Sequence, residues 1–339
     1  MTADPGQEPR PTSTSQFAAS EAFGVPPLEA VRDDVWALGL AMPGEHIPAS
    51  LLYLLRDAEG GLHLVDPGTD GDENFAAVES ALGTLGAGWG DVRTITVTHL
   101  HPDHLGMAER LRAATGAAVQ LSGIEADALG RLDSLRLTPD QVAARAALWG
   151  VPTARNPELL EAAGRAPDYP TVTVDRRLTD GQDLEVAGFA LRALVTPGHT
   201  PGHLCLVDES RGLLLSGDHL LPTMFSGLGL GGPTDSNALA DFVGSCTRVA
   251  ALGDLEVLPG HGYRFRGLPE RAAAAAEHHL RRTREVSGVL RSDPASSIWT
   301  VASQLTWTAG WENLTGFYLW SALSQVEMHR DYLAAGGAL

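Results

Sequence analysis

The sequence predicts a sheet-rich α/β fold, and three observations support this. Apolar runs of four to seven residues, bounded by Gly, Pro and Asp, recur from about residue 34 onward, and such runs are typical of strands. Helical patterns lie between some of these runs. Two longer segments, about 125–166 and the chain after Pro269, have helical periodicity and lack strand signals.

The predicted elements can be followed in chain order. Helices are expected over 74–85 and 105–114, and the second should end at Gly116, because glycine readily adopts the left-handed conformation that closes a helix. The predicted strands contain the runs at 51–55, 62–68, 92–98, 117–121, 190–198, 203–208, 212–218 and 255–260.

The pattern divides the chain into three parts. Residues 1–25 are rich in Pro, Ser, Thr and charge, which predicts a disordered N-terminal tail. Residues 26–268 hold the strands and form the predicted catalytic domain, with a helical insertion at about 125–166. Residues 269–339 form a predicted helical domain that contains four of the seven tryptophans. We expect these tryptophans to pack in a core or at a homodimer contact.

Composition narrows the class of protein. With 339 residues, of which 44% are apolar, the chain can build a stable core. Its 24 basic and 42 acidic residues give a net charge of −18, which disfavours nucleic acid as a partner. Cys205 and Cys246 are expected to be buried thiols. The sequence predicts no signal peptide and no membrane span, and therefore a cytoplasmic protein.

The segment THLHPDH, at residues 98–104, concentrates potential metal ligands directly after a predicted strand. In extended backbone, side chains at i and i+2 point the same way, so His99 and His101 can approach one cation. Asp103 and His104 follow where the chain turns into a helix, and they can serve a second cation. Imidazole and carboxylate suit zinc, iron and manganese, so this loop predicts two half-sites.

Three further residues can complete the site. His199, Asp218 and His261 each follow a predicted strand and lie beside a glycine, and strand ends can converge on one edge of a sheet-based fold. We therefore expect two divalent metal ions, with zinc preferred over iron or manganese. The expected assignment is His99, His101 and His199 on the first metal, Asp103, His104 and His261 on the second, and Asp218 as the bridge.

This HxHxDH motif, followed by single His, Asp and His residues, resembles the metallo-β-lactamase superfamily over roughly residues 30–265. The resemblance implies a four-layer αβ/βα sandwich with its metals at one rim. The segments TPGHTPGH and SGDH resemble the hydrolase branch that includes glyoxalase II-type thioesterases. The helical tail resembles the C-terminal domain of the β-lactamase-like protein 2 group.

The resemblance also implies a mechanism. In that mechanism a metal-bridging hydroxide would attack a carbonyl, so neither Ser nor Cys would be needed as the nucleophile. Asp103 is the expected catalytic residue, because in similar enzymes the equivalent aspartate ligates a metal and orients the attacking water. Asp66, which follows the strand at 62–65, stands where the family places an aspartate that supports the ligand loops.

Three other residues near the motifs are candidates for supporting or substrate-binding roles. His203 begins the strand at 203–208, which favours a structural hydrogen bond over a catalytic role. His219 directly follows Asp218, and Tyr263 lies two residues after His261. Either side chain could face the substrate, and a phenol such as that of Tyr263 can donate to a developing oxyanion.

The preferred function is a dinuclear metallohydrolase acting on a small acyl compound, with a thioester first and a lactone or other ester second. A dinuclear iron oxygenase or other redox enzyme would use the same ligands and is kept as an alternative. A nuclease or phosphodiesterase is a weaker alternative, because the arginines of the 125–166 segment are matched by acids.

Overall fold

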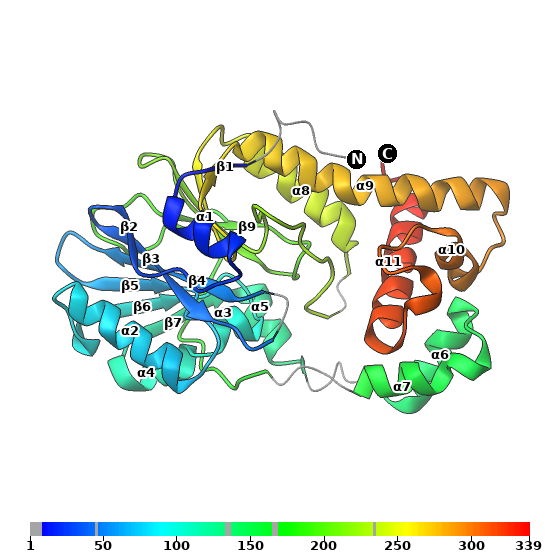
Figure 1. Cartoon of the computed structure of the whole chain (residues 1–339), viewed down its shortest axis with the longest axis horizontal. Coiled ribbons are helices and arrows are strands. Elements are labelled where there is room, and N and C mark those ends of the chain that lie inside the picture. Colours follow the sequence, from blue (N-terminus) through cyan, green and yellow to red (C-terminus); the bar gives the residue numbers. More distant parts are fainter. Residues whose placement is uncertain (1–8, 45–46, 133–136, 165–168, 233–234) are drawn as a thin grey trace.

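The computed structural model describes residues 9–44, 47–132, 137–164, 169–232 and 235–339, and it contains two facing sheets with helices on both outer sides (Figure 1). This is the αβ/βα arrangement that the motifs implied, and the predicted fold class is confirmed. Each sheet buries apolar residues on both faces, so that one core lies between the sheets and one lies under each helical layer.

The first sheet changes from antiparallel to parallel at its centre. Neighbours from β2 to β5 run antiparallel, and those from β5 to β8 run parallel. The carboxyl ends of β5, β6 and β7 therefore meet at one edge. In spatial order the strands are β2 (Glu29–Arg32), β3 (Val35–Ala41), β4 (Ala49–Arg56), β5 (Leu62–Val65), β6 (Val92–Thr96), β7 (Ala118–Ser122) and β8 (Arg176–Leu178).

The second sheet brings three further strand ends to the same rim. Strands β11 and β12 are parallel, and β9 runs antiparallel to β10, which itself runs antiparallel to β11. Strands β9, β11 and β12 therefore share one direction. In spatial order the strands are β1 (Arg10–Pro11), β13 (Phe265–Arg266), β12 (Glu256–Pro259), β11 (Leu213–Gly217), β10 (Leu204–Asp208) and β9 (Arg192–Val195).

Helices cover the outer face of each sheet. Helices α2 (Asp72–Thr84) and α4 (Ala108–Thr115) pack on the first sheet, and α8 (Ala238–Ala250) and α9 (Leu268–Ser292) pack on the second (Figure 1). Helix α4 ends at Gly116, whose φ of 73° is left-handed as predicted. Short helices α3 (Pro102–Leu105) and α5 (Gly123–Leu129) lie at the rim, and 3₁₀ turns cover Trp89–Asp91, Thr153–Arg155 and Trp311–Asn313.

The insertion and the C-terminal helices share one core beside the sandwich (Figure 1). It is formed by α6 (Pro139–Trp149), α7 (Asn156–Gly164), the end of α9, α10 (Ile298–Gln304) and α11 (Gly316–Ala334). The rings of Trp149 in the insertion and Trp320 in the C-terminal segment lie 4.8 Å apart, so these two tryptophans contact each other within the chain. Helix α9 crosses the predicted boundary at 268/269 and joins this core to the second sheet, and the division into domains stays a prediction.

The expectation of a disordered N-terminal tail is wrong for residues 9–25, which contain a strand and a helix. Residues 1–8 lie outside the described residues. Strand β1 pairs with β13, and helix α1 (Thr14–Glu21) is capped by Ser13, whose hydroxyl accepts from the backbone N–H of Gln16. The buried Gln16 side chain in turn accepts from the backbone N–H of Arg264 at 2.9 Å. These contacts come from distant segments, so local composition did not reveal them.

Cys205 and Cys246 are both buried and unpaired with each other, as predicted. Every helix in the described part of the chain is too short or too polar to cross a lipid bilayer.

Candidate metal centre

The rim where these strand ends meet carries all seven predicted ligands. His99 and His101 follow β6, while Asp103 and His104 lie on α3, which begins with Pro102. The remaining members come from the second sheet, where they follow the ends of strands β9, β11 and β12: His199, Asp218 and His261. The structure thus joins residues separated by more than 160 positions at one edge.

The ligand atoms form two groups with a carboxylate between them. In the first group, His101 Nδ1 lies 2.9 Å from His99 Nε2 and 3.2 Å from His199 Nε2. In the second, His261 Nε2 lies 3.2 Å from both His104 Nε2 and Asp103 Oδ2. Asp218 spans the two, with Oδ2 3.7 Å from His199 Nε2 and Oδ1 3.3 Å from His104 Nε2. This is the predicted grouping.

Hydrogen bonds on the outer side of each ring identify the nitrogen that faces the centre. The outer nitrogens of His101, His199 and His261 meet backbone carbonyls of Leu230, Gly227 and Ala49, at 2.7, 2.7 and 2.9 Å. A carbonyl only accepts, so each of these nitrogens carries the proton. Each ring therefore turns a lone pair inward.

In His104 and His99 the outer nitrogen also carries the proton, and here the Asp66 carboxylate determines this. Nδ1 of His104 donates to Asp66 Oδ2 at 2.9 Å. The Thr98 hydroxyl donates to the same oxygen at 2.8 Å, which leaves it free to accept from Nδ1 of His99 at 3.0 Å. Two neutral imidazole lone pairs cannot hydrogen-bond to each other, so the inner nitrogens require a cation or a proton between them.

These donors fit divalent metal ions. Asp218 Oδ1 is buried and makes no hydrogen bond, although it lies within 3.4 Å of two imidazole nitrogens. Imidazole and carboxylate groups whose ligand atoms lie within 4.8 Å of one another form three potential ligand sets in the described chain. Borderline cations such as zinc accept this combination of ligands.

The two groups of ligands differ in the pKa values of their histidines. Burial lowers the pKa of His101 to about 4, and the neighbouring His199 adds to this effect. Burial would also lower the pKa of His261, but Asp218 and Asp103 outweigh it and raise the pKa to about 10. Without metal, protons therefore occupy the second group at neutral pH, while the first group remains neutral.

Asp66 has the supporting position that the resemblance implied. Its carboxylate accepts from the backbone N–H and hydroxyl of Thr98 and from His104, so it orients one imidazole of each group. Its backbone has a φ of 57°, which is uncommon for a residue other than glycine and is tolerated by Asp. Asp66 as a whole is only 2% exposed.

Glu125 supports both ligand loops, and the sequence analysis missed it. This fully buried carboxylate accepts from the backbone N–H of Leu100 at 2.9 Å and from that of Gly202 at 2.6 Å. One bond holds the His99–His101 loop, and the other holds the loop that follows His199. The only local signal is Ser122, whose hydroxyl caps α5.

The remaining three candidates, His203, His219 and Tyr263, make contacts with other groups of the protein. His203 accepts from the backbone N–H of Asp218 at 3.1 Å and donates to Thr196 at 2.9 Å, so it fixes the bridging aspartate from behind. The supporting or substrate-binding roles of His219 and Tyr263 stay predictions. His219 packs against Phe242 and Tyr263 against Phe17, both are buried, and neither lines the two cavities described below.

The loop between β11 and α8 connects the ligands to helix α9. Its Gly227 and Leu230 carbonyls orient His199 and His101, as described above. Arg271 of α9 donates to the carbonyls of Leu221 and Met224 at 2.7 and 2.5 Å. His279, about two turns further along, donates to the Ser226 carbonyl at 3.1 Å. Helix α9 therefore holds the loop that sets two ring orientations.

Replacing Arg271 with Gln should loosen this loop and weaken metal binding about tenfold, because disturbing residues that orient ligands typically costs about 10 to 100-fold. The cobalt-loaded variant should also show an altered visible spectrum, which reports ligand geometry. Arg271→Lys keeps the charge and a single donor nitrogen, and it should recover part of the affinity. Arg284→Gln, an exposed change on the same helix, is the control. An unchanged spectrum with unchanged affinity in Arg271→Gln would contradict the role of this contact.

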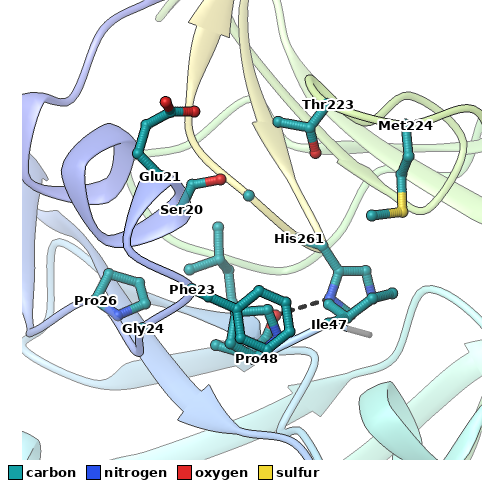
Figure 2. Close-up of a pocket in the computed structure, with 13 residues that line it drawn as sticks. Ser20, Glu21, Phe23, Gly24, Pro26, Ile47, Pro48, Thr223, Met224 and His261 are labelled. Carbon is teal, nitrogen blue, oxygen red and sulfur yellow. Dashed lines mark hydrogen bonds between the residues drawn. The ribbon is translucent and has the colours of Figure 1, made fainter. Parts of the chain in front are cut away.

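Two cavities adjoin the centre. The smaller, about 260 Å³, is lined by His261, Met224 and the N-terminal segment around Phe23. Figure 2 shows His261 at its wall, with the hydrogen bond from Nδ1 to the Ala49 carbonyl drawn as a dashed line. The larger, about 990 Å³, is lined by His101 and Asp103 on the other side. A substrate can therefore approach either group of ligands.

A layered αβ/βα protein with a paired His/Asp centre at its rim defines a metallohydrolase-type scaffold. The family model described as "Metallo-beta-lactamase superfamily" matches residues 49–261, which include every predicted ligand. The chain belongs to the metallo-β-lactamase superfamily.

Curated relatives match only part of their length. A lactamase-like protein of Penicillium aethiopicum is 35% identical over 117 residues, which are 34% of this chain and 36% of the relative. The β-lactamase-like protein 2 homolog of Caenorhabditis elegans is 29% identical over 132 residues, or 39% and 42% of the two chains. An atrochrysone carboxyl ACP thioesterase of Aspergillus chevalieri is 33% identical over 115 residues, or 34% of each chain. The chain thus spans about two fifths or less of these relatives.

Solved structures match over nearly the whole chain. A metallo-beta-lactamase family protein from Thermus thermophilus is 30% identical with a TM-score of 0.71, covering 91% of this chain and 96% of that one. A beta-lactamase domain protein from Burkholderia ambifaria has a TM-score of 0.76 at 24% identity, covering 98% and 94%. The second likeness concerns the fold alone, and its coverage includes the C-terminal helices.

Proposed function

We propose that the protein is a dinuclear zinc hydrolase of acyl compounds, acting on thioesters in the first place and on lactones or other esters in the second. The observation that carries this proposal is the set of five inward-facing imidazole nitrogens together with two carboxylates. The superfamily consists mainly of hydrolytic metalloenzymes, which agrees with such a centre.

The residues present divide the work between them. Bound divalent cations lower the pKa of a water molecule and polarise a substrate carbonyl. His99, His101 and His199 would hold one cation, His104 and His261 the other, and Asp218 both. Asp103 also lines the larger cavity, where it can accept a proton from the attacking water. Burial alone would raise the pKa of Asp103, but His104 and His261 outweigh it and lower the pKa to about 2, so the carboxylate is ionised at neutral pH.

Two observations favour a thioester or other neutral acyl substrate over a phosphodiester. One curated relative is named as an acyl carrier protein thioesterase. Arg177 is the only lysine or arginine among the described residues that line the larger cavity, and it already pairs with Asp127 at 2.6 Å. A phosphodiester would find little cationic surface there, and the net charge of −18 would repel a polyanion.

The test combines metal analysis with a substrate panel. Purified protein should contain about two zinc ions and hydrolyse S-lactoylglutathione or acyl-CoA faster than homoserine lactone, nitrocefin or a phosphodiester. A coloured, iron-loaded protein that consumes oxygen would instead support the redox alternative. Hydrolysis should disappear on chelation and return with zinc.

Asp103→Asn should lower kcat/KM at least about a hundredfold, because the amide keeps the shape of the side chain but neither accepts the proton nor ligates as an anion. The exposed change Asp140→Asn on α6 should leave the rate unchanged. Full activity in Asp103→Asn would rule out its assignment as the proton acceptor.

A further inference from the structure

The larger cavity is walled by segments far apart in the chain. His101 and Asp103 of the metal centre are among the residues that line it. Helix α5 contributes Leu129, helix α7 contributes Ala162, and helix α11 contributes Trp320. The insertion and the C-terminal helices therefore form part of the wall beside the ligands, and any substrate bound there touches both.

Most of the described side chains that line the cavity are apolar, and few are charged. Apart from Asp103, Arg177 is the only ionised side chain among its described lining residues, and Arg177 donates to both Asp127 and the Gly123 carbonyl at 2.6 Å. The other walls are largely Ala, Leu, Val, Gly and aromatic residues. A bound group would therefore gain from desolvation of apolar surface, whereas a charged group would find no free partner among these residues.

The cavity is large for a small acyl group. Its volume of about 990 Å³ lies at the upper end of the range of roughly 300–1,000 Å³ that is typical of sites for drug-sized ligands. Two large apolar side chains at its edge remain exposed, Leu230 at 42% and Phe317 at 62%. Apolar surface of this kind next to a cleft indicates a binding role.

Trp320 has a defined position in this wall. It is half-buried, and its ring contacts that of Trp149 on α6 edge to face at 4.8 Å. This contact fixes the indole from behind while another part of it lines the cavity. A ring held in this way offers a rigid apolar surface, which loses little conformational entropy when a ligand packs on it.

Building on the proposed hydrolase function, we infer that the substrate class is thioesters of large apolar acyl groups, of about ten carbons or more. The acyl group lies between α5, α7 and α11, with its carbonyl at the metal centre and its far end near Trp320. The helical insertion and the C-terminal helices thus select the acyl chain. This inference replaces the expectation of a small acyl substrate with that of a large one.

The experiment uses the full zinc-loaded chain and N-acetylcysteamine thioesters with acetyl, hexanoyl and dodecanoyl groups. Burial of each methylene favours binding severalfold, so kcat/KM should rise at least about 50-fold from acetyl to dodecanoyl. Ala162→Phe narrows the cavity and should lower dodecanoyl hydrolysis at least about 20-fold while acetyl hydrolysis changes less than about threefold. Ala147→Phe, an exposed position on α6, should change neither rate. Equal rates across the series, or an equal loss for all substrates in Ala162→Phe, would overturn the inference.

A binding measurement separates this inference from the proposed function. S-dodecyl-N-acetylcysteamine is a thioether without a thioester carbonyl, so it cannot be hydrolysed at that position. Calorimetric titration should show that it binds at least about 50-fold more tightly than the S-ethyl compound. Tight binding without hydrolysis of any thioester would support the apolar site and contradict the hydrolase. Hydrolysis without a difference between the two thioethers would contradict the apolar site alone.

Discussion

Replacing Asp218 with Asn should reduce kcat on the order of 10³-fold and lower the metal content from about two ions to one or fewer. Among the described residues, this carboxylate alone faces both ligand sets, with one oxygen 3.7 Å from His199 and the other 3.3 Å from His104. An amide offers one oxygen, while its NH₂ group cannot ligate a cation. Losing several kcal/mol of charge stabilisation corresponds to a rate change of this size.

In Asp218→Asn, metal affinity should fall most at the second ligand set, which contains His104. Burial opposes protonation of His104, but the negative charge of Asp218 is the main influence that raises the pKa of this ring. The same charge would attract a metal cation there. Metal analysis of the purified variant, followed by titration with zinc, measures the number and affinity of sites. Two tightly held ions in Asp218→Asn would contradict the bridging assignment.

Asp208→Asn provides a matched control for the loss of a buried carboxylate. Asp208 is 1% exposed and lies at the opposite end of β10, where it accepts from the backbone N–H of Ala190 and from Ser210. This change should lower the unfolding temperature without altering the metal content. A comparison of the two variants therefore separates a ligand effect from general destabilisation.

The site could be predicted from the sequence mainly where a local pattern coincides with a strand end. His99 and His101 could be paired because alternate residues of extended chain point the same way. Asp218 and His261 could be added because each follows an apolar run, and β11 and β12 are in fact parallel neighbours. The convergence of the two sheets came from the family resemblance, because neither composition nor periodicity specifies how sheets face each other.

Other features depend on contacts between distant segments and could not be predicted in this way. Glu125 resembles any glutamate in the first turn of a helix, and its role appears only when Leu100 and Gly202 are brought to it. Tyr263 lies close to a ligand in sequence, but its ring packs edge to face against Phe17 of α1. Order in that N-terminal segment likewise depends on the contact between Gln16 and Arg264.

Helix α8 is a different kind of omission, because its signal is local. Asn237 caps the helix, and its side chain accepts from the backbone N–H groups of Leu239 and Ala240. Leu239, Phe242, Cys246 and Val249 are buried along one face at helical spacing. The sequence therefore contained both the cap and the periodicity of this helix, so the helix could have been predicted.

Removing the metals with a chelator should lower the unfolding temperature by about 10 °C or more near pH 7.5. A ligand present at about 1,000 times its dissociation constant stabilises the folded state by about 4 kcal/mol, and each kcal/mol shifts the midpoint of a large domain by about 2–4 °C. The stabilisation by two buried ions should exceed the stabilisation by one. Differential scanning calorimetry of chelated, zinc-restored and untreated protein measures the shift, and full recovery with zinc is the control for irreversible damage.

The size of this shift should increase between pH 7 and pH 9. Asp218 and Asp103 outweigh burial and raise the pKa of His261 to about 10 in the folded, metal-free protein, above the unfolded value of about 6.5. This protonated ring stabilises the metal-free protein fully below about pH 6.5 and progressively less as the pH rises towards 10. The pKa of His101, lowered by burial to about 4, leaves that ring neutral in both states above pH 7, so it does not oppose the trend. Metal also competes with fewer protons at the higher pH. The two unfolding temperatures should therefore diverge as the pH rises, whereas a constant or narrowing difference would show that protons do not take the place of metal in the second ligand set.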